Sequence, residues 1–126
     1  EKAARGTDGR VWPWGNDWDP KKCKCGDSAD RFSETAPIGS YPAGASPYGV
    51  MDMAGNVWEW CADWYDKGYC AQSPARNPKG PVSGQKRVMR GGSWGSLPVG
   101  TCSFNRCGLL PPSEWDAYTG FRPAAK

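Results

Sequence analysis

Polar and apolar side chains alternate along one short stretch in the middle of the chain, residues 57–62. A period of two predicts a β-strand with one buried face. A second strand, ending in glycines, is predicted at residues 87–94, and a short closing strand at residues 120–123. Residues 1–5 have the pattern of the end of a helix that Gly6 stops. Three further stretches have no period and are expected to be loops: residues 17–37, 66–86 and 95–119.

Glycine and proline are unusually frequent, with 17 and 12 residues in a chain of 126. Both residues interrupt helices and strands, so long regular elements are not expected. The 8 Trp and 5 Tyr residues offset this, because each large aromatic side chain buries much area. We expect Trp58, Trp60 and Trp64 to lie in or against the core. The composition therefore predicts one ordered but irregular domain.

Charge and composition exclude several classes of function. The net charge is +3, and the cluster of Lys21, Lys22 and Lys24 is expected to be a solvated loop, with no nucleic-acid partner. No apolar run approaches the roughly 20 residues of a membrane span. The chain contains no His, which excludes His-based catalysis and His-ligated metal centres.

A series of short motifs matches one family in order and spacing along the whole chain. The motifs are Glu1-Lys-Ala-Ala-Arg-Gly6, Trp12-Pro-Trp-Gly-Asn16, Asp52-Met-Ala-Gly-Asn-Val-Trp-Glu-Trp60, Asp63-Trp-Tyr65, Arg90-Gly-Gly-Ser-Trp94 and Gly120-Phe-Arg122. In these motifs the chain resembles the formylglycine-generating-enzyme (sulfatase-modifying factor) domain. The resemblance implies an α+β, C-type lectin-like fold, rich in loops and with short antiparallel strands. It also implies that residues 1–126 form a single domain, equivalent to the C-terminal part of a longer family domain.

The resemblance implies that the active members of this family are copper-dependent oxidases that use two Cys residues. The first of these lies just after the Gly-Gly-Ser-aromatic motif. Residues 95–98 follow that motif here and contain no Cys. Cys102 and Cys107 have a C-x₄-C spacing that suits a cuprous ion, but they come several residues too late. We therefore expect no catalytic residue and no copper. The alternatives are a copper-dependent formylglycine-generating oxidase that uses these two thiols, or a catalytically inactive structural relative.

A structural calcium ion is implied by the resemblance at the segment from Asp52 to Glu59. Calcium takes roughly six to eight oxygen ligands. Asp52 and Glu59 would supply side-chain oxygens, and Gly55 and Val57 would supply main-chain carbonyls. The alternative is that Glu59 and Asn56 only satisfy a buried turn by hydrogen bonding. A second calcium loop of the family would fall near residues 22–36, where Lys24 replaces an Asn ligand.

The stretch from Gly95 to Thr119 is unlike the two family motifs that flank it, and its charged residues are Arg106, Glu114 and Asp116. Its position resembles that of the hypervariable stretch in the variable proteins of diversity-generating retroelements. The variation in those proteins excludes Lys, Glu, Gln, Met and Trp from mutated positions, and residues 95–113 contain none of these types. An ordinary divergent loop of a non-catalytic relative is the alternative.

The resulting hypothesis is a non-catalytic protein in which a rigid aromatic scaffold presents residues 95–119 to a protein or another surface ligand. We expect a location at the cell surface or outside the cell. The expected contact residues are Gly95, Ser96, Leu97, Val99, Thr101, Phe104, Asn105, Leu109, Leu110, Ser113, Trp115, Asp116 and Tyr118.

Overall fold

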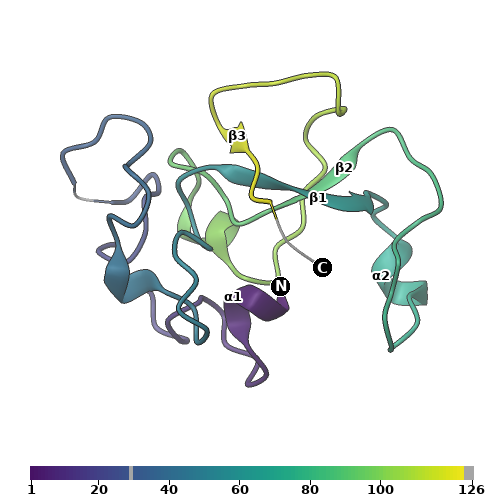
Figure 1. Cartoon of the computed structure of the whole chain (residues 1–126), viewed down its shortest axis with the longest axis horizontal. Helices are drawn as coiled ribbons and strands as arrows, with labels where there is room; N and C mark the ends of the chain where they lie inside the picture. The colour runs from purple at the N-terminus through teal and green to yellow at the C-terminus, as the bar shows by residue number, and fades with distance from the viewer. Residues whose placement is uncertain (29, 124–126) are drawn as a thin grey trace.

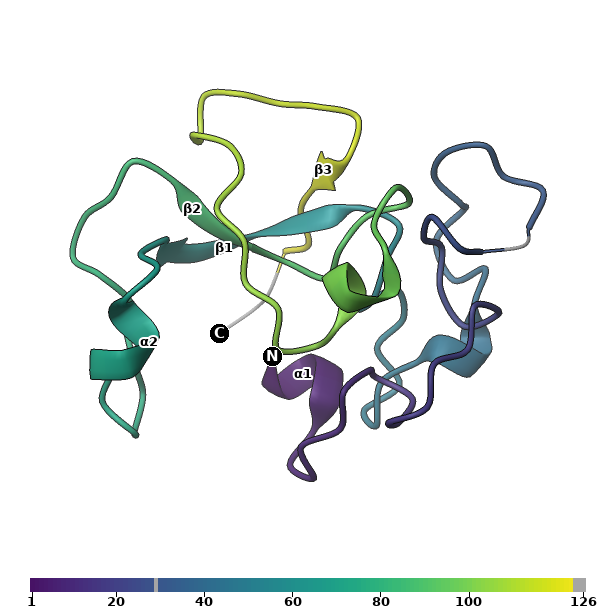
Figure 2. The same cartoon turned by 180° about the vertical axis from the view of Figure 1, so that it is seen from behind.

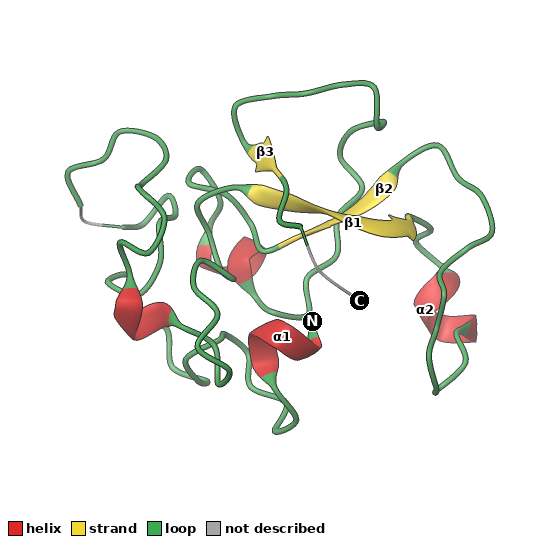
Figure 3. Cartoon of the chain, viewed as in Figure 1, coloured by secondary structure: helices red, strands yellow, loops and turns green. Residues whose placement is uncertain are grey.

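The computed structural model describes residues 1–28 and 30–123. Most of this chain is loop, arranged around a three-stranded sheet at the centre of the molecule (Figure 1 and Figure 3). The strands lie side by side in the order β2-β1-β3. In chain order the elements, with η for 3-10 helices, are α1 (Lys2–Arg5), η1 (Pro42–Gly44), β1 (Trp58–Trp64), α2 (Tyr69–Gln72), β2 (Arg87–Arg90), η2 (Pro98–Thr101) and β3 (Thr119–Gly120).

The central strand β1 pairs antiparallel with β2 and parallel with β3. Trp60 lies opposite Met89, and the register shifts between Trp60 and Trp64. The expected antiparallel strands are therefore confirmed for β1 and β2, whereas the closing strand is parallel. The reason is its connection: the chain leaves β2, crosses to the other side of β1, and places Thr119 beside Trp58 at the beginning of that strand.

The ends of two elements show how glycine limits regular structure. Helix α1 ends at Gly6, as predicted, where φ is 67°. Strand β2 ends at Arg90 and not at Trp94, because Gly91 and Gly92 have φ values of 92° and 77° that no extended strand allows. Within the described residues, no helix is long and apolar enough to cross a membrane.

The hydrophobic core of the described residues is small. Met89 and Val88 of β2 are 0% and 2% exposed. A second group consists of Cys23, Cys25 and Ala54, against which two Trp side chains pack. Those side chains, Trp14 and Trp18, stand next to Trp12, with ring centroids 5.3 to 6.2 Å apart among the three. Of the three Trp residues expected in or against the core, Trp58 is buried, and Trp60 and Trp64 are half-buried.

A main-chain junction at Gly55 joins the N-terminal loops to the sheet. The Asn56 N–H donates to the Lys24 carbonyl at 2.7 Å, and the Gly55 N–H donates to the Gly91 carbonyl at 2.7 Å. The backbones are so close that a Cβ at Gly55 would lie 2.0 Å from the Lys24 carbonyl oxygen. Gly55 also has a φ of 75°, which side chains disfavour. Glycine is therefore required at this position on both grounds.

Substitution of Gly55 tests the junction, and Gly49 offers a matched control because it has the same φ of 75° but a Cβ added there would meet no atom within 4 Å. Gly49→Ala should lower the free energy of unfolding by about 1–2 kcal/mol, from backbone strain alone. Gly55→Ala should lose about 1–3 kcal/mol more, because the methyl group collides with main chain. Urea denaturation of both variants measures the difference. Equal losses would show that the Lys24 backbone can move away at no cost.

Candidate functional site

The segment of residues 95–119 is anchored at both ends by aromatic side chains. The rings of Trp94 and Tyr118 stack with centroids 4.5 Å apart. The Trp94 Nε1–H donates to the Ala117 carbonyl at 3.0 Å, and the Trp58 N–H donates to the Tyr118 carbonyl at 2.7 Å. The two ends of the segment are thus held together and against the beginning of β1.

The middle of the segment is attached to the scaffold through its backbone. Cys107 exchanges two hydrogen bonds with Met89 of β2, at 2.7 and 3.0 Å. The Ser103 N–H donates to the Val11 carbonyl at 2.8 Å. Between Cys107 and β3 the chain arches away from the sheet, as Figure 1 and Figure 2 show from opposite sides.

Two cationic side chains bind carbonyl oxygens of the segment: Arg90 at the end of β2, and Lys86 immediately before β2. The Arg90 guanidinium donates to the carbonyls of Ser103 and Asn105 at 3.3 and 3.0 Å. The Lys86 ammonium donates to the Leu109 carbonyl at 3.0 Å. These contacts hold main-chain atoms, which every residue has, and so they do not depend on the side chains of the segment.

Most of the large side chains of the segment point into solvent. Trp115 is 89% exposed, Val99 71% and Leu97 65%. Phe104, Leu109 and Tyr118 follow at 40 to 50%. Of the smaller expected contact residues, Gly95 and Ser113 are exposed, and Ser96, Asn105, Leu110 and Asp116 are half-buried. The apolar members are therefore all accessible to solvent, and we call this set of side chains the outer face (Leu97, Val99, Phe104, Leu109, Trp115 and Tyr118).

Thr101 corrects the expected set of contact residues, because its side chain is fully buried. Its hydroxyl donates to the Pro98 carbonyl at 2.8 Å and accepts from Trp12 Nε1 at 3.2 Å. Ser96 and Asn105 also have internal contacts: the Ser96 hydroxyl accepts from the Ser93 N–H, and the Asn105 amide donates to the Gly100 carbonyl. These three polar side chains hold the loop in shape.

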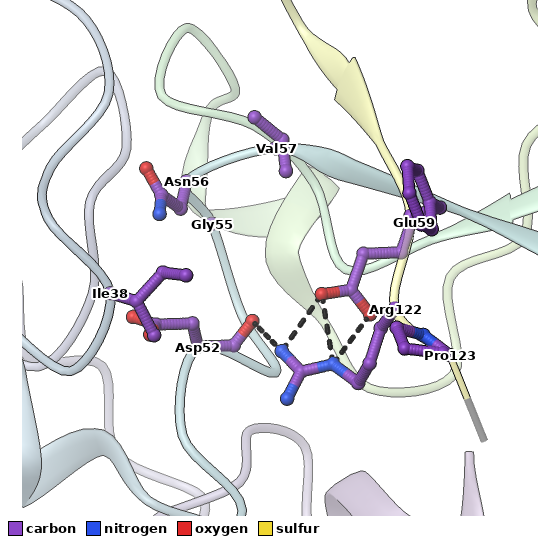
Figure 4. A pocket seen from close by; sticks show the side chains of 9 residues that line it. Ile38, Asp52, Gly55, Asn56, Val57, Glu59, Arg122 and Pro123 are labelled. Atoms are coloured by element: carbon purple, nitrogen blue, oxygen red, sulfur yellow. Dashed lines mark hydrogen bonds and ion pairs between the residues drawn. The ribbon is translucent and has the colours of Figure 1, made fainter. Parts of the chain in front are cut away.

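The four expected calcium ligands line one cavity of about 240 Å³ (Figure 4). The cavity has a polar side formed by Asp52, Asn56 and Glu59, and its rim includes the exposed apolar side chains of Ile38 and Phe121. Asp52 and Asn56 have positive φ values of 57° and 66°. These left-handed residues turn the backbone sharply between Asp52 and β1, and the turn brings the four residues together.

Arg122 is a cavity residue that the sequence analysis quoted only as part of a motif. Its guanidinium contacts both carboxylate oxygens of Glu59, at 2.8 to 3.1 Å (Figure 4). It also donates to the carbonyls of Met51 and Asp52, at 2.9 and 3.3 Å. The contact joins residues 63 positions apart, and no local pattern in the sequence could have predicted it.

The donor set of this cavity fits a calcium ion only if main-chain oxygens take part. Within residues 1–28 and 30–123, no three His, Cys, Asp or Glu side chains come close enough to hold a metal ion together. Asp52 already accepts from the Gly39 N–H through Oδ2, and Glu59 accepts from Arg122. A carboxylate has about four acceptor positions, so both groups keep capacity for a further cation.

The thiols of Cys102 and Cys107 lie in surroundings that disfavour the thiolate. Cys102 is buried, with its Sγ 3.9 Å from the Pro98 carbonyl oxygen, and Cys107 is half-buried. Desolvation by burial raises the pKa of both groups. Copper binding and nucleophilic chemistry both use the thiolate, so this environment is unfavourable for either.

Comparison with known proteins covers the whole chain. Residues 1–126 match the model of the sulfatase-modifying factor enzyme 1-like domain. A formylglycine-generating enzyme from Thermomonospora curvata is 35% identical over 148 aligned residues, which cover 99% of this chain and 46% of that enzyme.

Two solved structures share the fold. Treponema denticola variable protein 1 has a TM-score of 0.74 and 28% identity, over 95% of this chain and 41% of the other. PvdO from Pseudomonas aeruginosa has a TM-score of 0.80 and 28% identity, over 95% of this chain and 47% of the other. The chain thus spans less than half the length of each of these proteins. The similarities confirm the expected C-type lectin-like fold.

The exposure of the outer face predicts tolerance to substitution. Val99→Ser should change the free energy of unfolding by no more than about 0.5 kcal/mol, since the side chain is already in water. The same substitution at Val88, which is 2% exposed, should cost more than about 1.5 kcal/mol. Leu97→Ser should behave like Val99→Ser. Chemical denaturation of the three variants checks this, and a large loss at residue 97 or 99 would mean that the segment packs inward in solution.

Proposed function

Because the chain belongs to the sulfatase-modifying factor enzyme 1-like domain family, we propose that it is a non-catalytic member that binds a ligand through the outer face of residues 95–119. One observation carries the proposal: large apolar side chains point outward from a segment whose backbone is fixed at both ends and in the middle. Its similarity to Treponema denticola variable protein 1 fits a variable segment on this fold, whereas its similarity to the formylglycine-generating enzyme fits the alternative considered below.

The fixed backbone favours binding for an entropic reason. A mobile loop must be ordered when its ligand binds, and ordering costs free energy for every side chain and backbone unit that is immobilised. Here the stack of Trp94 on Tyr118 and the bridge from Cys107 to Met89 order the segment before any ligand arrives. Less of the free energy gained by contact is therefore offset by ordering of the segment.

The composition of the outer face suits a protein surface as the ligand. Burial of its apolar side chains contributes roughly 25 cal/mol per Å². Trp and Tyr, which it contains at positions 115 and 118, are among the residues that dominate protein interfaces. The few charged residues of the segment keep the cost of removing water low.

The alternative is a copper-dependent oxidase that uses Cys102 and Cys107. The buried position of Cys102 and the raised pKa of both thiols argue against it. Residues 95–98 also lack Cys, at the place where the family resemblance implies a catalytic thiol.

A randomised library tests the proposed binding face. We would vary Leu97, Val99, Phe104, Leu109 and Trp115 together on displayed protein, and leave Tyr118 in place as an anchor. A control library would vary exposed apolar residues elsewhere: Ile38, Tyr48, Val82 and Phe121. With hen lysozyme as the probe, binders should come from the first library and not from the second. Failure of the first library to fold, or equal recovery of binders from both, would contradict the proposal.

An oxidation assay on the same protein separates the binding function from the alternative. A peptide with the cysteine of a sulfatase active site would be incubated with the protein, copper(I) and oxygen. We expect no conversion of that cysteine to formylglycine by mass spectrometry. Turnover that disappears in Cys102→Ser would establish the oxidase and overturn our assignment.

We also propose that the cavity of Figure 4 binds a structural calcium ion through Asp52 and Glu59 and the carbonyls of Gly55 and Val57. Two carboxylates and one guanidinium leave the cavity with an excess of negative charge. An oxygen-only donor set on a turn with left-handed residues suits a hard cation. The ion would fix the turn that leads into β1.

Calcium should therefore raise the melting temperature of the protein above the value measured in the presence of a chelator. With a dissociation constant of roughly 0.1–1 mM, about 5 mM calcium would add about 1–2 kcal/mol of stability by mass action. Arg122→Gln, which removes the competing guanidinium, should keep or enlarge the response, and Asp52→Asn should reduce it. Differential scanning fluorimetry measures all three proteins. A response confined to Arg122→Gln, or absent from every protein, would exclude calcium from the natural site.

A further inference from the structure

Lys24 is a charged side chain in the interior, at 6% exposure. The prediction that the cluster of Lys21, Lys22 and Lys24 is solvated is therefore wrong for this residue. Lys21 is exposed and Lys22 is half-buried, but Lys24 is buried and stands in the sequence between two buried residues, Cys23 and Cys25. A buried ammonium is costly to desolvate, so its surroundings need an explanation.

The ammonium of Lys24 is surrounded by oxygen atoms of three kinds. It lies 2.7 Å from the Phe32 carbonyl oxygen, 3.1 and 3.4 Å from the two carboxylate oxygens of Asp30, and 3.3 Å from the Ser28 hydroxyl. Carboxylate, carbonyl and hydroxyl oxygens are also the donors that calcium takes in proteins. We call these four residues the Lys24 cage.

Asp30 is held in place as an anion by groups other than Lys24. Tyr41 donates its hydroxyl to Asp30 Oδ2 at 2.6 Å, and the Phe32 N–H donates to Oδ1 at 2.7 Å. Desolvation raises the pKa of Asp30, but hydrogen bonds from Ser28, Tyr41, Phe32 and Lys24 outweigh it and hold the pKa well below its usual range. The Tyr41 hydroxyl and the Phe32 N–H would therefore still hold the Asp30 carboxylate if Lys24 were replaced.

The cage is also tied to the core through the backbone of Lys24. The Lys24 carbonyl accepts from the Asn56 N–H at the Gly55 junction, and the chain on either side of it is buried. The Ser28 hydroxyl donates to the neighbouring Cys25 carbonyl at 2.8 Å, and Tyr41 holds Asp30, so these oxygen atoms keep a support when the ammonium is removed. An anion withdrawn from water that loses its partner cation is left with an uncompensated desolvation cost.

We propose that the Lys24 cage is a cation-binding loop whose cation is the chain's own ammonium, and that removal of this ammonium converts the cage into a site for free calcium. The family resemblance implies a calcium loop in this region, but with Lys24 in place the residues do not fit a metal ion. The ammonium occupies the position at which the oxygens converge. The natural chain thus holds this loop closed without a metal.

The test compares Lys24→Ala with Lys22→Ala. The second variant loses the same charge, but from a half-buried side chain near Asp19, two residues before Lys24. In chelator, Lys24→Ala should melt about 5–10 °C below the wild type, and Lys22→Ala should stay close to it. By isothermal titration with calcium chloride, Lys24→Ala should bind one ion more than the wild type, with a dissociation constant of roughly 0.1–1 mM. Addition of Asp30→Asn should abolish that extra ion.

Each result decides the matter. If Lys24→Ala binds no more calcium than the wild type up to about 10 mM, or melts like Lys22→Ala, the proposal is overturned. If the variant is unfolded in chelator, recovery of folded protein on refolding with calcium supports the proposal. Failure of both Lys24→Ala and Lys24→Asn to recover with calcium counts against it. The comparison with the wild type subtracts any ion bound in the cavity of Figure 4.

Discussion

The approach of the Lys24 backbone to Gly55 is the constraint on which the other features depend. Hydrogen bonds from this junction reach Gly91, and Asn56 in turn accepts from the Trp94 N–H at 2.8 Å, where the 95–119 segment begins. The turn between Asp52 and β1, which contains Gly55, positions the cavity residues. The Lys24 side of the junction carries the Lys24 cage. In a chain with so little regular structure, this contact does the positioning that sheets and helices do elsewhere.

Sequence patterns predicted the parts of the fold that local chemistry determines. The period of two located β1, and the glycine after residue 5 marked the end of α1. The parallel pairing of β3 could not be predicted, because two residues carry no period and their partner is distant in sequence. Burial was equally hidden where no period exists: Thr101 ends the short 3-10 helix η2 and Lys24 lies in a loop, and only tertiary contacts show that both point inward.

The exposure of the candidate segment could be predicted from the sequence for a related reason. Low charge and apolar content marked residues 95–119 as a surface, and the structure places Leu97, Val99 and Trp115 outward. The supports of that surface were not visible in the sequence, because Arg90 and Lys86 bind carbonyl oxygens and not side chains. Support of this kind is independent of the residues displayed, and this independence is the physical condition for a surface that varies on a constant scaffold.

The bridge at Cys107 and the stack at Tyr118 divide the segment into two parts with different evolutionary freedom. Before Cys107 the backbone is tied at Ser103 and folded into η2, so a change of length there would displace buried atoms. After Leu109, whose carbonyl Lys86 binds, the chain arches away from the sheet until Trp94 binds the Ala117 carbonyl just before β3 (Figure 2). Because the cost of closing a loop grows only slowly with its length, insertions and deletions in this arch are cheap. The molecule can therefore diversify by the size of its protrusion as well as by the identity of its side chains.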